Sequence, residues 1–300
     1  MHFYSLRIRF ILAVVVLITT VSFSYQKNQH EYPLKESSLL WKIESPNSKK
    51  VSYLFGTMHL IEKEYFIFPD KLSKIVEKSD ALVMEMAGIP DQMEAMKYIL
   101  LSEGSFFDFF DDKQQDSIFV WAKNEMGLTP EAFKATFDKM KPFVAIQMAT
   151  QLQFMGKVES YEMSFDAIAK KNKIELIGLE TIAQQIALFD NMTKSEQSQM
   201  VMEGIRDSKK SLETMKSIQQ IYKRQQIDSL YMMIHSEGGI IAEKEADFLE
   251  NRNKNWIQNI KEIISNKKAF IAVGAGHLGG PNGVIRLLEK EGYTLTPIKL

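Results

Sequence analysis

The sequence predicts an α/β fold with a central, mostly parallel sheet built from both ends of the chain and large helical insertions. Short apolar runs at 81–84, 174–177 and 269–273 are separated by long stretches in which apolar residues recur three and four positions apart. Continuous apolar runs joined by helices are typical of buried parallel strands. With 300 residues, 45% hydrophobic and 25% charged, the chain is expected to fold around a sizeable core.

The first 24 residues have the pattern of a secretory signal. Arg7 and Arg9 precede an uncharged apolar run over residues 10–21, and small serines follow at 22–24. This order of basic, apolar and small residues is typical of signal peptides, and the run is short for a bilayer span, which needs about 20 residues. We therefore expect export to the periplasm or the extracellular space. Residues 1–24 are expected to be removed or kept as a membrane anchor.

The remaining elements follow from apolar patterning and turn residues. A loose polar leader at 25–37 precedes the folded domain, residues 38–300. Turn chemistry at 45–48 separates its first two strands, and Thr129 before Pro130 is a helix-entry signal. The expected order is strands at 38–43 and 51–55, a helix at 69–78, a strand at 81–84, a mainly helical insertion at about 91–169, a strand at 174–177, a second helical insertion at about 181–264, a strand at 269–273, a helix at 282–290 and a closing strand at 293–298.

Composition excludes several classes of function. Lys and Arg total 37 against 38 Asp and Glu, so the net charge of −1 gives no reason to expect a nucleic-acid partner. The absence of cysteine excludes disulfides, thiolate zinc sites and cysteine nucleophiles. Gly274, Gly276 and Gly279 fit a dinucleotide-binding spacing, but that site also needs an acidic residue about 20 positions on, after the next strand. The chain reaches Leu300 without one, which argues against a nucleotide cofactor.

Two segments share one local design, an apolar strand followed by glycine, two residues and histidine. Gly56 precedes His59 in the first copy, and Gly274 precedes His277 in the second. We expect each glycine to let the backbone leave the strand with angles closed to other residues. Each histidine then lies in the crevice where open α/β sheets bind ligands, and imidazole can bind a metal or move a proton there.

Two other predicted strands end on a carboxylate, Glu85 after 81–84 and Glu180 after 174–177. A buried carboxylate requires a partner. If these strands neighbour the two histidine-bearing strands, His59, Glu85, Glu180 and His277 converge on one crevice. Such a set suits Zn²⁺, Mn²⁺, Co²⁺ or Fe²⁺, with a spare carboxylate as general base. The alternative for Glu180 is an ordinary acid before a helix, and the histidines are equally consistent with structural roles at strand ends.

The combination of motifs resembles the TraB/GumN family, whose relatives include the animal Tiki proteases. The resemblance rests on Trp41, Tyr53–His59, Leu82–Glu85, Lys141-Pro142, Asp166, Ala169, Leu179–Thr181 with Gln184 or Gln185, Arg252, Asn253, Trp256 and Val273–Gly280. It implies an α/β fold, the two Gly-x-x-His motifs and acidic partners at the site. By position it adds Arg252 and Asn253 as catalytic candidates. Arg252 is then expected to hold a carboxylate or a developing oxyanion, unless it is a helix-surface residue.

Three functions stay open at this level. The first is an exported, metal-dependent hydrolase, a peptidase in the Tiki branch, that uses Mn²⁺, Co²⁺ or Zn²⁺ on His59, His277, Glu85 and Glu180. The second is a protein that binds a peptide or small ligand without cleaving it, as in pheromone shut-off. The third is a metal-free hydrolase with a histidine base, as in the distantly similar erythromycin esterases. In each case the partner is a peptide or small molecule, and membrane contact is expected solely through an uncleaved N-terminal segment.

Overall fold

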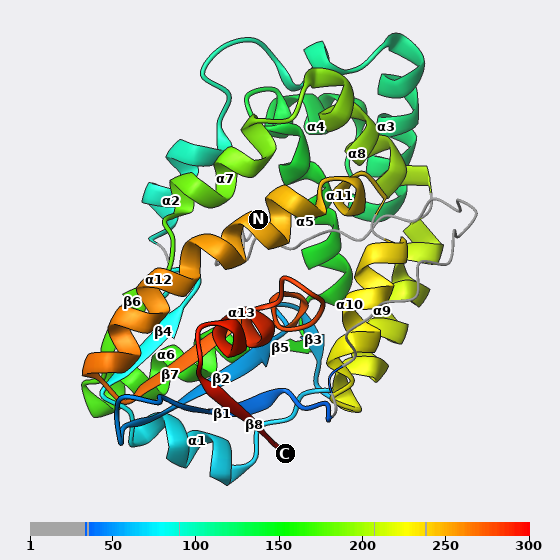
Figure 1. The fold of residues 1–300 in the computed structure, drawn as a ribbon. Coiled ribbons are helices and arrows are strands. Elements are labelled where there is room, and N and C mark those ends of the chain that lie inside the picture. Colours follow the sequence, from blue (N-terminus) through cyan, green and yellow to red (C-terminus); the bar gives the residue numbers. More distant parts are fainter. Residues whose placement is uncertain (1–33, 35, 90, 207, 238) are drawn as a thin grey trace.

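A computed structural model describes residues 34, 36–89, 91–206, 208–237 and 239–300. The predicted signal segment lies outside these residues, as does most of the leader. The α/β fold class is confirmed: the central sheet has six strands in the order β6-β4-β7-β2-β1-β8 (Figure 1). The strands are β1 (Leu40–Glu44), β2 (Val51–Thr57), β4 (Ala81–Met84), β6 (Glu175–Gly178), β7 (Ala269–Gly274) and β8 (Thr294–Ile298).

The four strands that carry the candidate site are parallel neighbours. β2 pairs with β7, β7 with β4, and β4 with β6, whereas β1 pairs antiparallel with β2 and β8. In this register Thr57 lies opposite Gly274, and Met84 lies opposite both Ala272 and Gly178. The carboxyl ends of the four strands therefore meet at one edge of the sheet.

Helices cover both faces of the sheet. α1 (Asp70–Glu77) and α6 (Tyr161–Asn172) pack together on one face, and in Figure 1 α1 is seen below the strands. α12 (Asn251–Asn266) and α13 (Val284–Lys290) lie in front of the sheet. This arrangement follows from right-handed crossovers. The chain steps from β2 through β4 to β6 with helices on one face, and then reverses to β7 with its helix on the other face. Because both faces are covered, β4 is buried along its whole length.

The two predicted insertions are mainly helical. They contain α2 (Gln92–Ile99), a short 3-10 turn (Phe106–Phe109), α3 (Asp112–Met126), α4 (Pro130–Phe137), α5 (Pro142–Phe154), α7 (Ile182–Asp190), α8 (Lys194–Arg206), α9 (Ser208–Lys223), α10 (Ile227–Glu237), α11 (Gly239–Glu243) and a π-helical turn, η2 (Ala246–Glu250). Most of them pack around a second, aromatic-rich core that includes Phe106, Phe133 and Phe137. The insertions thus form a helical layer above the carboxyl edge of the sheet (Figure 1).

One small element was not predicted. β3 (Ile61–Glu62) and β5 (Val158–Glu159) pair as an antiparallel ribbon that joins the loop after β2 to the segment before α6. Two-residue strands carry no periodic apolar pattern, so the sequence offered no signal for them. The ribbon places the end of β2 next to the beginning of α6.

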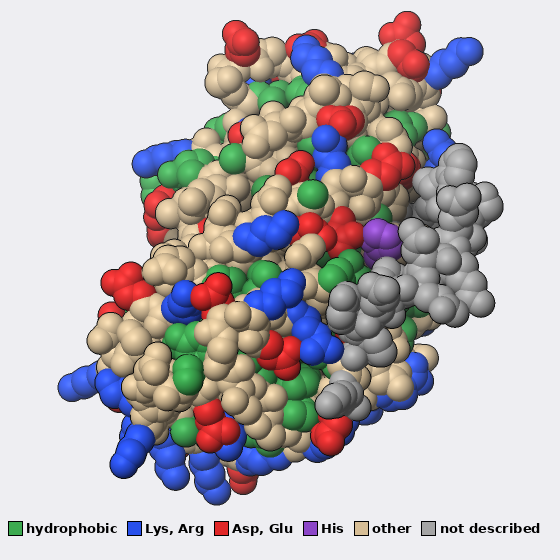
Figure 2. Space-filling view, in the orientation of Figure 1, with side chains coloured by type: hydrophobic (Ala, Val, Ile, Leu, Met, Phe, Trp, Pro, Cys, Tyr) green, Lys and Arg blue, Asp and Glu red, His purple; other side chains and the backbone are tan. Residues whose placement is uncertain are grey.

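Within the described ranges, no helix combines the length and apolar character that a membrane crossing requires. On the face drawn in Figure 2, acidic and basic side chains are interspersed, and basic side chains gather at the lower end of the molecule. The export prediction stays a prediction.

Candidate active site

The two Gly-x-x-His motifs lie where the sheet changes winding direction. The chain leaves β2 toward α1 on one face, and it leaves β7 toward α13 on the other face, although β2 and β7 are neighbours. Diverging connections open a crevice at the carboxyl ends of adjacent strands, the usual ligand position in such folds. His59 follows β2 in this crevice, and His277 ends the 3-10 turn Ala275–His277 directly after β7.

Arg252 connects the predicted site residues. It lies at the start of α12, and its side chain is 10% exposed. Its Nη2 donates to Glu85 Oε2 at 2.6 Å and to Glu180 Oε1, and its Nε donates to Glu180 Oε2 at 3.1 Å. Its Nη1 donates to the carbonyl of Phe248 at 3.0 Å and lies 3.1 Å from His277 Nε2. The structure therefore brings Glu85, Glu180, Arg252 and His277 together, with the guanidinium in the middle.

The electrostatics of this cluster favour the charged form of Glu85. Burial alone raises the pKa of Glu85, but Arg252 and then the histidines outweigh burial and hold the pKa well below its usual range. The backbone N–H of Gly274 adds a hydrogen bond to Glu85 Oε1 at 2.8 Å. Burial lowers the pKa of Arg252, and its two glutamates raise it again. Glu85 and Arg252 thus form a buried ion pair that stays charged at neutral pH.

Gln185 and Trp256 complete the surroundings of the glutamates. Gln185 Nε2 donates to Glu180 Oε1 at 2.7 Å and to Glu85 Oε2 at 3.3 Å, and Trp256 Nε1 donates to Glu180 Oε2 at 3.3 Å. Gln184, the other candidate, instead closes a capping box with Thr181 at the start of α7. The structure therefore selects Gln185 as the site residue of the pair. Glu180 is more than an acid before a helix, because its carboxylate is held by three side chains.

Asn253 fixes the orientation of His277. Its amide Nδ2 donates to the carbonyl of Asn282 at 2.9 Å, so its Oδ1 faces His277 Nδ1 at 2.7 Å. His277 Nδ1 then carries the proton, and Nε2 accepts from Arg252. Burial and the neighbouring Arg252 lower the pKa of His277 to about 3, so the ring is neutral at physiological pH.

His59 has a different partner, Glu162, which lies in the first turn of α6. Nδ1 of His59 and Oε1 of Glu162 are 2.9 Å apart, off the line of a well-aligned hydrogen bond, and both side chains are about a quarter exposed (25% and 26%). Thr57 and Ser160 donate their hydroxyls to the two Glu162 oxygens at 2.9 and 3.1 Å. Burial lowers the pKa of His59, but Glu162 outweighs burial and raises it to about 9. The pKa of Glu162 is lowered in turn.

The expectation about the motif glycines is wrong. Gly56 continues β2, Gly274 has φ −51°, and neither has positive φ. The structure shows close approach instead: a Cβ on Gly56 would lie 3.0 Å from the Cα and Cβ of Ala275, and one on Gly274 would lie 3.3 Å from Glu85 Oε1. The first glycine lets the two motif loops touch, and the second lets its N–H reach Glu85.

The predicted ligands of a divalent metal do not form a ligand set in this arrangement. Within the described residues, no group of three or more His, Asp or Glu side chains is placed to hold a metal ion. The Arg252 guanidinium lies between Glu85 and Glu180 and already contacts His277 Nε2. The guanidinium occupies the space that a metal bridging the two carboxylates would need, and its N–H groups already use their oxygens. The four predicted ligands, His59, Glu85, Glu180 and His277, therefore do not fit a metal ion between the two glutamates as they are arranged here.

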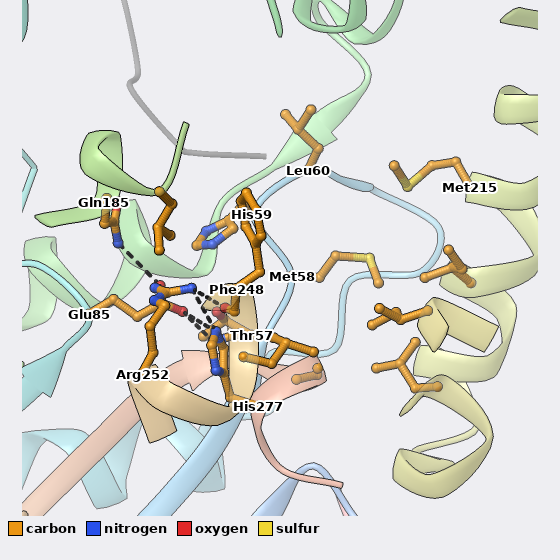
Figure 3. Close-up of a pocket in the computed structure, with 18 residues that line it drawn as sticks. Thr57, Met58, His59, Leu60, Glu85, Gln185, Met215, Phe248, Arg252 and His277 are labelled. Atoms are coloured by element: carbon orange, nitrogen blue, oxygen red, sulfur yellow. Dashed lines mark hydrogen bonds and ion pairs between the residues drawn. The ribbon is translucent and has the colours of Figure 1, made fainter. Parts of the chain in front are cut away.

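A pocket opens above this edge of the sheet (Figure 3). Its polar side contains His59, Glu85, Gln185, Arg252 and His277, and the rest of its wall is largely apolar. Figure 3 shows His59, Arg252 and His277 directed toward the same space, with Met215 on the helices opposite. The pocket is lined by Thr57, Met58, His59, Leu60, Glu85, Gln185, Leu188, Met215, Ile218, Leu230, Ile234, Phe248, Leu249, Arg252, Gly274, Ala275, Gly276 and His277.

Sequence reasoning missed Glu162 and the apolar wall. Glu162 follows Ser160, the residue that caps α6, so its position reads as an ordinary first-turn acid. The apolar wall comes from helices whose residues read as core. No local pattern in the sequence pointed to a pair between Glu162 and His59.

Comparison with known proteins agrees with these motifs. No curated protein and no solved structure matches the chain at a significant level. A model of the TraB/PrgY/gumN family matches residues 39–297, which include His59, Glu85, Glu180, Arg252, Asn253 and His277. With most of its length matched, this chain belongs to the TraB/PrgY/gumN family.

Proposed function

We propose that this chain is a hydrolase that cleaves a peptide or another carbonyl substrate in the pocket, with His59 as general base. The observation that carries the proposal is the pairing of His59 Nδ1 with the Glu162 carboxylate at 2.9 Å on the wall of the pocket. A carboxylate behind one ring nitrogen orients the imidazole and stabilises the imidazolium that forms when the other nitrogen takes a proton. Nε2 of His59 is then the atom that meets water.

The proposed reaction needs one water molecule. Neutral His59 takes a proton at Nε2, and the water oxygen forms a bond to the substrate carbonyl carbon. The C–N or C–O bond of the tetrahedral intermediate then breaks, and the imidazolium returns its proton to the leaving group. Glu162 stays ionised throughout, and Thr57 and Ser160 hold it in place.

The proposal differs from metal-dependent hydrolysis in the group that activates water, which is His59 and not a bound metal ion. In this proposal Glu85, Glu180 and Arg252 hold His277 and the motif loops in position. They supply no ligand for Mn²⁺, Co²⁺ or Zn²⁺. Metal dependence stays a prediction from the histidine and glutamate pattern and from the family resemblance, and the same assay tests it. Binding without cleavage is the remaining outcome.

The test is a pH profile of kcat/KM on a mixture of peptides, followed by mass spectrometry. Because the base form of His59 has to be present, we expect kcat/KM to rise about tenfold per pH unit from 7 and to level near the His59 pKa of about 9. Glu162→Gln removes the main cause of the raised pKa, so the rising part of the profile is expected to shift by more than one pH unit toward acid, with a lower plateau.

Matched variants and chelation complete the experiment. His59→Gln is expected to lose at least a hundredfold in kcat/KM. His235→Gln is the control, because the half-exposed His235 lies on α10, contacts Glu245 and does not line the pocket. Full activity of His59→Gln contradicts the proposal. Activity that EDTA abolishes and Mn²⁺, Co²⁺ or Zn²⁺ restores supports the metal-dependent alternative instead.

A further inference from the structure

The wall of the pocket opposite the histidines is apolar and comes from one helical hairpin. Met215 and Ile218 belong to α9, and Leu230 and Ile234 belong to α10. Met215 and Ile234 are half-buried, so they border open space as well as core. Figure 3 shows Met215 facing the pocket from the helices on the right, and Met58 extends toward it from the loop after β2.

Among the described residues that line the pocket, no charged side chain belongs to this wall. The π-helical turn adds Phe248 and Leu249 to it, just before Arg252 turns down to the glutamates. The charged groups that line the pocket lie on its other side, and there Arg252 and Glu85 neutralise each other at 2.6 Å. A charged substrate group placed against the wall would lose water without gaining a counter-ion, which is costly.

The wall is fixed relative to the sheet. Tyr222, at the end of α9, donates its buried hydroxyl to the carbonyl of Gly56 at 2.7 Å. Gln219 accepts from the backbone N–H of Glu62 at 2.6 Å. On α10, Ile234 lies so close to Gly276 that a Cβ there would come within 2.9 Å of its Cδ1. Both helices of the hairpin are thus tied to the loops that carry the histidines.

We propose that the α9–α10 wall is a subsite for one uncharged apolar side chain of the substrate, next to the bond that is cleaved. The inference rests on the proposed hydrolase function and adds the substrate class. The size of the wall residues and the absence of polar partners favour Leu, Ile, Met or Phe at this position, and they disfavour Asp, Glu, Lys and Arg.

The cleavage experiment uses a peptide library with randomised central positions. We expect Leu, Ile, Met and Phe to be enriched at least tenfold over Asp, Glu and Lys on one side of the cleaved bonds. Met215→Glu is expected to reduce that enrichment at least tenfold and to raise cleavage beside Lys and Arg, because a carboxylate then faces the side chain. Met93→Glu is the control, because Met93 is 80% exposed on α2 and does not line the pocket.

A binding experiment separates failure of the subsite from failure of the hydrolase. His59→Gln protein is titrated with N-acetyl-Leu-Leu-methylamide and with its Asp-Asp counterpart by calorimetry. Binding of the leucine compound at least tenfold more tightly, lost in Met215→Glu, supports the subsite even where no peptide is cleaved. Cleavage without side-chain preference overturns the inference, and so does equal or undetectable binding of the two compounds in the absence of cleavage.

Discussion

At the scale of single residues, the donors of Arg252 decide what it can do. A guanidinium has five N–H groups. The contacts of Arg252 use Nε once and each Nη twice, on Glu85, Glu180, His277 and the carbonyl of Phe248. Of the two roles expected for this residue, the structure supports holding carboxylates. No donor is left for a developing oxyanion, so Arg252 is a positioning residue.

Removing this guanidinium is expected to leave buried charges without compensation. Arg252→Met keeps the length of the side chain but strands Glu85 and Glu180, and we expect it to lower the free energy of unfolding by about 3–5 kcal/mol. Adding Glu85→Gln and Glu180→Gln is expected to recover part of that loss, because no charge is then stranded. Urea unfolding followed by circular dichroism measures both variants.

Lys254→Met on the same helix is the control for Arg252→Met. Lys254 is 49% exposed and contacts Glu250 at 3.4 Å, so its removal is expected to change stability by less than about 0.5 kcal/mol. An Arg252→Met protein as stable as the wild type would contradict the buried-charge account.

At the scale of elements, the contact between the two motif loops depends on Gly56. Gly56→Ala places a methyl group 3.0 Å from Ala275 and 3.1 Å from Leu278. We expect a loss of about 1–3 kcal/mol in stability, as for other overpacked cores, and a larger loss of kcat/KM because the motif loops move apart. Thermal unfolding and the peptide assay measure the two effects.

Two further variants test that explanation. Gly204→Ala is the control, because its nearest neighbours are side-chain atoms of Ile146 at 3.3 Å and more, which can adjust. Ala275→Gly combined with Gly56→Ala removes one methyl from the contact and is expected to restore part of the stability. Loss of the same size in Gly204→Ala would show that Gly56 has no special role.

The sequence predicted the elements well where the apolar pattern was strong. The runs at 81–84 and 269–273 became β4 and β7, and because parallel strands share an edge, the residues that follow four strands could be expected to converge. The pairing of His59 with Glu162 could not be predicted, because the two residues lie on different elements and follow no common spacing. The π-helical turn before Arg252 likewise lies inside an unbroken helical pattern.

At the scale of the whole molecule, the two histidines set opposite pH dependences of stability. The pKa of His59 is raised from 6.5 to about 9, so its contribution is present below pH 6.5 and is lost as pH rises toward 9. The pKa of His277 is lowered from 6.5 to about 3, so its contribution is present above pH 6.5 and is lost as pH falls toward 3. The pKa of Glu85 is also lowered, so the contribution of Glu85 to stability is likewise lost as pH falls into the acidic range.

We therefore expect stability to be highest near pH 6.5. This lies well below the pH of about 9 at which kcat/KM is expected to reach its plateau. Urea midpoints measured from pH 5 to 9 test this expectation. His59→Gln is expected to remove the alkaline decline and leave the acidic one, whereas His235→Gln keeps both. A wild-type protein whose midpoint rises steadily up to pH 9 would show that the His59–Glu162 pair does not stabilise the fold.

The pairing of β1 with β8 has a consequence for synthesis on the ribosome. Leu40 lies opposite Ile298, and Ser38 donates its hydroxyl to the carbonyl of Ile298, 260 residues further along the chain. His59 therefore leaves the ribosome long before His277 is made, so the two motif loops cannot pack against each other in the early nascent chain. The crevice that carries the proposed site is therefore incomplete in a growing chain until β7 has been made.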